Sequence, residues 1–251
     1  MARLDDLTRG LLRLVVLLGA CGWSTLSAAS LEAPQYHHTA WSMEQGAPVD
    51  VWALAQGSDG YLWLGTGTGL YRFDGLQFEL QAPPASYPFV TTNITSLHMG
   101  PDDRLWIGFL LGGISMLHKG RFTHYTGDAM PTAMVLGFVT DRDGAVWAAS
   151  TSGLSRFDGR RWAKVGQDWG YPSDRADALL LDSHGTLWAS TGNTLVYLPR
   201  GERRFRPSGE SVSHFASLGF RRRSPVRRAQ WRARDDSRCR RRRYRWIGRY
   251  G

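Results

Sequence analysis

Residues 59–78 read DGYLWLGTGTGLYRFDGLQF, and variants of this stretch recur three more times along the chain. The later copies, at 105–122, 146–162 and 187–205, read LWIGFLLGGISMLHKGRF, VWAASTSGLSRFDGRRW and LWASTGNTLVYLPRGERRF. The central tryptophans are spaced 43, 41 and 41 residues apart; they are Trp63, Trp106, Trp147 and Trp188. The aromatic residues that end the copies are spaced 44, 40 and 43 apart; they are Phe78, Phe122, Trp162 and Phe205. Two independent markers keep one period, so the chain contains an internal repeat.

The local pattern inside each copy predicts strands. Short apolar or alternating runs rich in β-branched and aromatic residues are separated by glycines, with no helical period. The first copy divides into four runs, at 51–56, 61–66, 70–73 and 77–80, with Asp-Gly pairs that suit tight turns. Four short strands in about forty residues are typical of one propeller blade. We therefore predict an all-β fold, a partial β-propeller of about four to five blades of four antiparallel strands.

Several polar and aromatic residues of the repeat have structural roles in this prediction. The turn aspartates are expected to shape the backbone and not to act as catalytic acids; they are Asp59, Asp74, Asp143 and Asp158. The four central tryptophans are expected in the core between blades. His118 and His184 fall at turn positions, where we expect them to be solvated.

The two ends of the repeat array predict a ring that is not closed. Residues 36–41 are predicted as the outer strand of a preceding blade, and a fifth copy begins at 211–218, where the pattern stops by Phe220. The fourth copy lacks the Arg-Phe-Asp-Gly run, which leaves its outer hairpin in doubt. Open blade edges favour self-association.

The first copy carries a family resemblance. GYLWLGTGTGLYRFDG, at 60–75, resembles the two-component regulator propeller repeat, and the lead-in WSMEQGAP at 41–48 is similar to that family's approach to its first blade. The resemblance extends over about residues 36–220, and the second copy departs most, with Asp103-Arg104 in place of Asp-Gly. It implies the periplasmic sensor region of a bacterial hybrid histidine kinase or diguanylate cyclase, with a signalling output domain in the full-length relative.

The N-terminal segment, residues 1–29, predicts export. Arginines precede a short apolar run, and small residues offer a cleavage site after Ala28 or Ala29. The run is too short to span a bilayer. A second interpretation is a lipoprotein box that would leave Cys21 lipidated. The predicted localisation is periplasmic or cell-surface, and domain 30–220 holds the propeller repeats.

Residues 221–251 form an arginine-rich tail with a net charge of +12, which leaves −3 for residues 1–220. Three interpretations stay open: a nucleic-acid-binding arm, a polybasic membrane-surface segment, or translation in a shifted reading frame that truncates the propeller. Export argues against a nucleic-acid partner, and the loss of the repeat in mid-blade favours the shifted frame.

The repeat region contains none of the common catalytic or metal-binding motifs, such as HExxH, CxxC, a phosphate loop or GxSxG. We therefore predict a non-enzymatic binding module with no cofactor and no metal. Two inter-blade connections, 82–92 and 166–175, are long and aromatic. The candidate ligand-binding residues in them are Tyr87, Trp169, Tyr171 and Arg175, suited to a small molecule such as a carbohydrate.

Two other functions are alternatives. A propeller lyase of the streptogramin-lyase type needs a histidine and an acid at the axis, and His98 is the candidate because it lies in an inner strand. The third function is an exported or lipidated interaction scaffold.

Overall fold

The computed structural model describes residues 38–212. The predicted signal segment and the arginine-rich tail lie outside the described residues, as does most of the predicted fifth copy. The chain divides into two compact units, residues 1–40 and 41–251, and the description below concerns the second.

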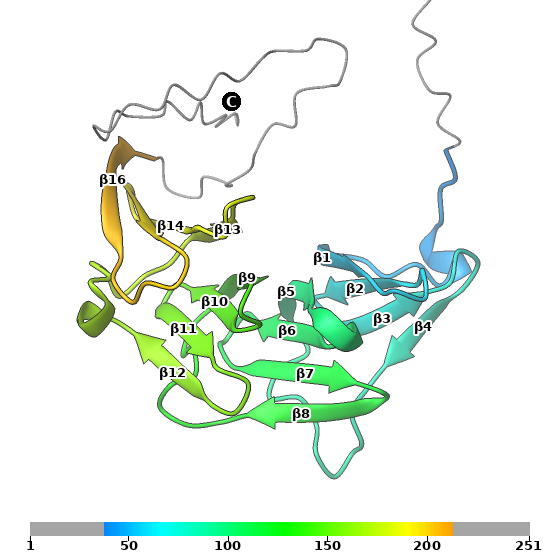
Figure 1. Ribbon diagram of the computed structural model, residues 1–251. Coiled ribbons are helices and arrows are strands. Elements are labelled where there is room, and N and C mark those ends of the chain that lie inside the picture. Colours follow the sequence, from blue (N-terminus) through cyan, green and yellow to red (C-terminus); the bar gives the residue numbers. More distant parts are fainter. Residues whose placement is uncertain (1–37, 213–251) are drawn as a thin grey trace, which may run out of the picture. The chain divides into compact units, whose positions relative to one another are not determined.

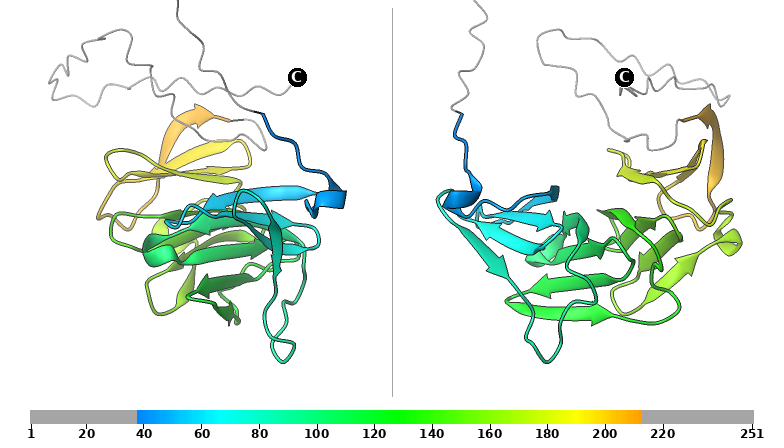
Figure 2. Two further views of the ribbon diagram at one scale, coloured as in Figure 1. Left: turned by 90° about the vertical axis from the view of Figure 1, so that its right-hand side faces the viewer. Right: turned by 180° about the vertical axis from the view of Figure 1, so that it is seen from behind.

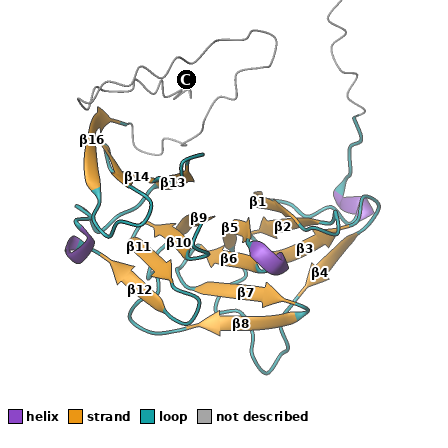
Figure 3. Ribbon diagram, viewed as in Figure 1, coloured by secondary structure: helices purple, strands orange, loops and turns teal. Residues whose placement is uncertain are grey.

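Strands dominate the described residues, which form four antiparallel sheets of four strands each (Figures 1 and 3). The first sheet holds β1 (Val51–Gln56), β2 (Leu62–Thr66), β3 (Gly69–Phe73) and β4 (Phe78–Gln81). The second holds β5 (Ile94–Met99), β6 (Leu105–Phe109), β7 (Ile114–His118) and β8 (Arg121–Tyr125). The third holds β9 (Val135–Thr140), β10 (Val146–Ser150), β11 (Gly153–Phe157) and β12 (Trp162–Val165). The fourth holds β13 (Ala178–Leu181), β14 (Leu187–Thr191), β15 (Thr194–Leu198) and β16 (Arg206–Ser211). Short 3-10 helices are η1 (Met43–Gln45), η2 (Pro101–Asp103) and η3 (Gln167–Trp169).

These sheets confirm the predicted propeller blades. Within each sheet the strands follow chain order. The first strands of the four sheets lie side by side in space, β1 next to β5, β5 next to β9 and β9 next to β13 (Figures 1 and 2). Residues 38–212 do not close a ring, as predicted.

Three clusters of buried side chains hold neighbouring sheets together. Leu70, Ile94 and Ile107 belong to the cluster between the first and second sheets. Trp106 belongs to the next, and Trp147 to the one between the third and fourth sheets. Trp106, Trp147 and Trp188 are only 1%, 2% and 8% exposed, which confirms their predicted core role, whereas Trp63 is half-buried. Each buried aromatic side chain contributes a large apolar area, so these clusters are the main source of cohesion between sheets.

Asp59, Asp74 and Asp158 accept backbone N–H groups in their turns, as predicted, whereas the Asp143 side chain pairs with Arg200 instead. Asp74 accepts hydrogen bonds at Oδ1 from the backbone N–H groups of Leu76 and Gln77, both at 2.7 Å. Asp158 repeats the arrangement two sheets later with Arg160 and Arg161, both at 2.9 Å. The backbone hydrogen bond from Gln77 is the main cause that holds the pKa of Asp74 below its ordinary value, and the bond from Arg161 has the same effect on Asp158.

A second set of aspartates fixes the central tryptophans, a role that the sequence did not indicate. Asp141 accepts the indole Nε1–H of Trp147 at 2.8 Å, and its other oxygen accepts backbone N–H groups of the same turn. Asp182 holds Trp188 in the same way at 3.2 Å. Burial raises the pKa of Asp182, but hydrogen bonds from Thr186, Trp188 and His184 outweigh it and leave the pKa below its ordinary value.

The fourth sheet contains an outer hairpin, formed by β15 and β16, which the sequence analysis had left in doubt. β16 pairs with β15 although the loop 199–205 stands in place of an Asp-Gly turn, and a register shift between Thr194 and Val196 marks a bulge at the opposite end of the pair. Ser211 belongs to β16, and the prediction that it begins a fifth inner strand is therefore wrong at this residue.

Two further predictions fail near the ends of other elements. Residues 38–41 contain no strand; instead Trp41 packs edge-on against Phe73, with ring centroids 4.9 Å apart. His184 is exposed as predicted, but His118 ends β7 half-buried, with its Nε2 buried and without a hydrogen-bond partner among the described residues.

Candidate functional site

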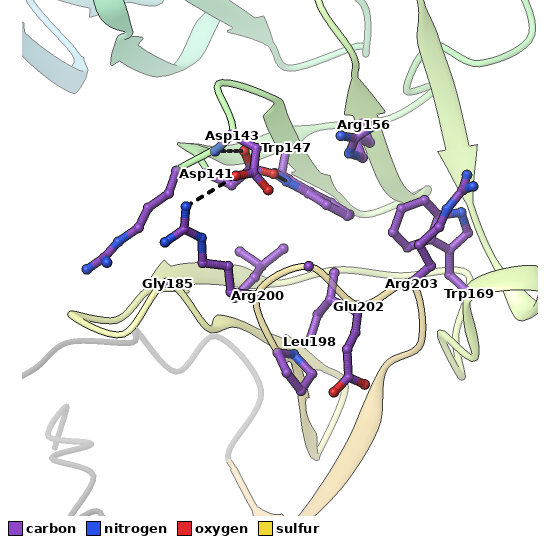
Figure 4. Close-up of a pocket in the computed structure, with 14 residues that line it drawn as sticks. Asp141, Asp143, Trp147, Arg156, Trp169, Gly185, Leu198, Arg200, Glu202 and Arg203 are labelled. Carbon is purple, nitrogen blue, oxygen red and sulfur yellow. Dashed lines mark hydrogen bonds and ion pairs between the residues drawn. The ribbon is translucent and has the colours of Figure 1, made fainter.

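A cavity of about 260 Å³ lies between the third and fourth sheets, and we call it the arginine cavity (Figure 4). The β9–β10 turn, strands β10 and β11, η3 and the β15–β16 loop all contribute to its wall. Its charged lining residues are Asp141, Arg142, Asp143, Arg156, Arg200, Glu202 and Arg203. Arginines thus outnumber acids by four to three.

Two tryptophans form the apolar part of the cavity. Trp147 on β10 is the cross-strand neighbour of Arg156 on β11, so both side chains stand on the face directed at the fourth sheet. Trp169, in η3, packs edge-on against Trp147 with ring centroids 5.6 Å apart. Gly170 caps the end of η3, and its φ of 65° is in the left-handed region that favours glycine.

Two guanidinium groups lie close to Trp169. The Cζ atom of Arg203 is 4.9 Å from the ring centroid and that of Arg156 is 5.8 Å away. Arg156 also lies 5.5 Å from the ring of Trp147. Both contacts are within the range of cation–π attraction, which holds the two positive charges beside one indole.

Each acid of the cavity already has a partner. Asp141 accepts the indole N–H of Trp147, and Asp143 pairs with Arg200 at 3.5 Å. Glu202 points away from the tryptophans and pairs with Arg206 at 2.6 Å (Figure 4). Arg156 and Arg203 form no ion pair with a carboxylate in the described part of the chain, and the Nε of Arg156 is buried without an acceptor.

A second, shallower cavity of about 500 Å³ contains two of the other predicted ligand contacts, Tyr171 and Arg175. Tyr171 is only 1% exposed, its hydroxyl donates to the backbone oxygen of Arg175 at 2.9 Å, and burial raises its pKa. Arg175 pairs with the buried Asp177, which also accepts the backbone N–H of Gly192. Through these contacts both side chains stabilise the segment that leads into β13. The ring of Tyr171 has no exposed face on which a ligand could stack.

Tyr87, the fourth predicted contact, lies apart from both cavities. It is 49% exposed and packs against His124, with ring centroids 4.3 Å apart and its hydroxyl donating to the His124 backbone oxygen at 3.4 Å. The structure therefore does not bring the four predicted residues to one site. Trp169 alone lies in the arginine cavity.

The sequence analysis missed the arginines of this cavity. Arg156 occupies the same repeat position as Arg72, so the sequence pattern alone does not distinguish them. Arg200 and Arg203 lie in the β15–β16 loop, where the fourth copy departs from the repeat. That departure was the one available signal.

His98, the candidate for lyase chemistry, lies half-buried on β5. Its Nε2 is 2.8 Å from the hydroxyl of Thr140 on β9, and burial lowers its pKa. No group of three or more histidine, cysteine, aspartate or glutamate side chains within residues 38–212 is placed to hold a metal ion. None of the helices described is long and apolar enough to cross a membrane.

Comparison with known proteins supports the repeat and the fold. Residues 46–68 match the family model of the two component regulator propeller. A search of curated proteins found no match.

Solved propeller structures resemble the chain at low identity. One is the extracellular domain of a hybrid two component system from B. thetaiotaomicron, with a TM-score of 0.55 and 17% identity over 63% of this chain and 23% of that one. Another is virginiamycin B lyase from Staphylococcus aureus, with a TM-score of 0.51 and 14% identity over 63% of this chain and 55% of that one. The chain thus spans about a quarter and about half of these proteins, and at such identities the likeness concerns the fold alone.

Proposed function

We propose that this chain, whose first sheet carries a two-component regulator propeller repeat, is an extracytoplasmic module that senses a small ligand for a bacterial signal-transduction protein. The observation that carries the sensing part is the arginine cavity, where a half-buried tryptophan and unpaired guanidinium groups line a space between two sheets. Concave sites with aromatic walls and a few convergent polar groups are the usual form of small-molecule sites.

The position between sheets gives a route from binding to signalling. The cavity wall combines residues of the third sheet with the β15–β16 loop of the fourth. A ligand that binds one relative placement of these sheets more tightly shifts their equilibrium by that difference in affinity. In the proposed full-length protein, an output domain would respond to this shift.

The binding test uses the full chain and its intrinsic tryptophan fluorescence. Neutral and acidic mono- and disaccharides are titrated into the wild type, Trp169→Phe and the control Trp52→Phe, since Trp52 is 65% exposed on β1, outside both cavities. We expect a saturable change that Trp169→Phe abolishes and Trp52→Phe retains. A response that persists unchanged in Trp169→Phe would contradict this site.

The same titration separates a sensor from a lyase. A sensor releases its ligand unchanged, whereas an enzyme of the lyase class converts it. Mass spectrometry of the ligand after long incubation decides between them, and conversion that His98→Ala abolishes would replace the sensing proposal.

Export is tested separately, because residues 1–29 lie outside the described structure. Fusion of residues 1–35 to a phosphatase that is active only after export should give active enzyme. Metabolic labelling with a fatty acid, with Cys21→Ser as control, distinguishes a lipoprotein from a cleaved signal.

A further inference from the structure

The polar groups of the arginine cavity are unequally satisfied. Its three acids have hydrogen-bond or ion-pair partners inside the protein, and Arg200 shares one of them. The guanidinium groups of Arg156 and Arg203 contact aromatic rings, and Arg156 also acts electrostatically on the exposed Asp158 without forming an ion pair with it. Among the residues that line the cavity, positive charges therefore outnumber negative ones, and no lining carboxylate forms an ion pair with Arg156 or Arg203.

The Nε–H of Arg156 is the sharpest sign of a missing acceptor. It is buried, and no protein acceptor reaches it. A buried donor without a partner destabilises the protein, so an acceptor that reaches it when the side chain shifts on binding adds to the affinity. A carboxylate suits the position, because its two oxygens match the planar fork of a guanidinium.

The size and wall of the cavity limit the rest of the ligand. A volume of about 260 Å³ is just below the range of about 300–1,000 Å³ found for drug-sized ligands. Arg203, which is exposed, lies over the ring of Trp169, so stacking of a neutral sugar on this tryptophan must first displace a cation–π contact. A ligand that binds the guanidinium groups needs no such displacement.

We infer that the arginine cavity binds a small ring compound that bears a carboxylate, with the carboxylate on Arg156 and the ring beside Trp169 and Arg203. The inference rests on the proposed function, because it names the ligand class of the same cavity. It makes Arg156 the residue that selects an anionic ligand over a neutral one of the same shape.

The test compares D-glucuronate with D-glucose, which differ at the carboxylate. Arg156→Gln is compared with Arg72→Gln, the matched control at the same repeat position, whose side chain pairs with Glu79 on the first sheet. We expect glucuronate to bind the wild type and Arg72→Gln alike, and Arg156→Gln to bind it about tenfold or more weakly. The Nε–H resonance of Arg156 should shift in NMR spectra on addition of glucuronate and not of glucose.

Each failure has a distinct meaning. If glucose and glucuronate bind equally, and Trp169→Phe removes both, the sensing site stands and the carboxylate inference is wrong. If glucuronate, benzoate and sulfate all leave the Arg156 resonance unmoved, the inference is overturned whatever the neutral sugars do. If sulfate shifts it as strongly as glucuronate, the site takes oxyanions in general and the ring has no role. Should Arg156→Gln fail to fold, the exposed Arg203→Gln provides the second variant.

Discussion

The first and third sheets carry the same repeat residues in different surroundings. Trp63 and Arg72 form a cross-strand pair in the first sheet, as Trp147 and Arg156 do in the third. Arg72 lies over Tyr61 and pairs with Glu79 at 3.0 Å, whereas the Nε of Arg156 is buried without an acceptor. The repeat therefore determines the strands, and the neighbouring sheet and loop determine whether a pair becomes structural or part of a cavity.

Burial differs between the two sheets in the same way. The third sheet packs against a neighbour on both faces, while the first leaves Trp52 and Leu54 65% and 63% exposed. Asp141 fixes Trp147, but Gly57 occupies the corresponding position beside Trp63. Four experiments test this difference.

Truncation of the central tryptophan should have the largest effect. Trp147→Ala removes a side chain that is 2% exposed, and we expect a loss of about 3–5 kcal/mol in the free energy of unfolding. Trp63→Ala should cost clearly less, because Trp63 is half-buried and belongs to a sheet with one exposed face. Urea unfolding of both variants measures the losses, and equal losses would break the comparison.

Removal of the aspartate that binds the Trp147 indole should have the second largest effect on stability. Asp141→Ala leaves the Trp147 N–H and two turn amides without their acceptor, and we expect a loss of about 1–3 kcal/mol. The control Asp59→Ala removes one exposed hydrogen bond to the Tyr61 amide and should cost under about 1 kcal/mol. A loss in Asp141→Ala no greater than in the control would show that the indole bond contributes nothing to stability.

The missing aspartate can be supplied to the first sheet. A Cβ on Gly57 would lie 3.6 Å from the Trp63 Nε1 and 2.5 Å from the Asp59 Oδ1, a flexible carboxylate that can move. We expect Gly57→Asp to be more stable than Gly57→Ala by about 0.5–1.5 kcal/mol, the usual contribution of one hydrogen bond. Thermal unfolding of the two variants provides the measurement. If Gly57→Asp is less stable than Gly57→Ala, an aspartate at this position does not form the stabilising hydrogen bond with the Trp63 indole.

The smallest effect concerns what the two sheets share. Asp74 and Asp158 both have a pKa held below the ordinary value by backbone hydrogen bonds. Such a group stabilises the fold above its unfolded pKa of about 3.9 and loses that contribution as pH falls through the lower folded value. Asp74→Asn and Asp158→Asn should therefore each lower Tm slightly and equally at pH 6, with the difference from wild type vanishing by about pH 2. Unequal shifts would show that the turns also depend on neighbouring sheets.

Local features of the fold could be predicted from sequence. The Asp-Gly turns and alternating runs set the strand positions of the first copy to within a residue, because hairpin geometry is a local property. β16 was left in doubt because the fourth copy lacks the Arg-Phe-Asp-Gly run, whereas pairing of β15 with β16 needs only backbone groups in register. Trp41 was assigned to a strand because its packing against Phe73 is a contact between distant residues.

The candidate site was largely beyond sequence analysis. Trp169 was identified as an aromatic residue in a long connection, but Tyr171 in the same connection is buried in the core. The burial of Arg156 depends on η3 and on the β15–β16 loop, which follow it by many residues in the chain. Residue type and spacing do not encode which of two identical repeat positions will face such a loop.

The packing between sheets has a consequence for how such a gene can change. Within residues 38–212 each sheet is one continuous segment, and the three buried clusters join segments that are neighbours in the chain, first with second, second with third and third with fourth. Arrays of this kind have stabilities that are close to sums of units and nearest-neighbour interfaces. Addition or loss of one segment at an end of the array therefore leaves the remaining interfaces intact, so that recombination there can alter the number of blades without redesign of the others.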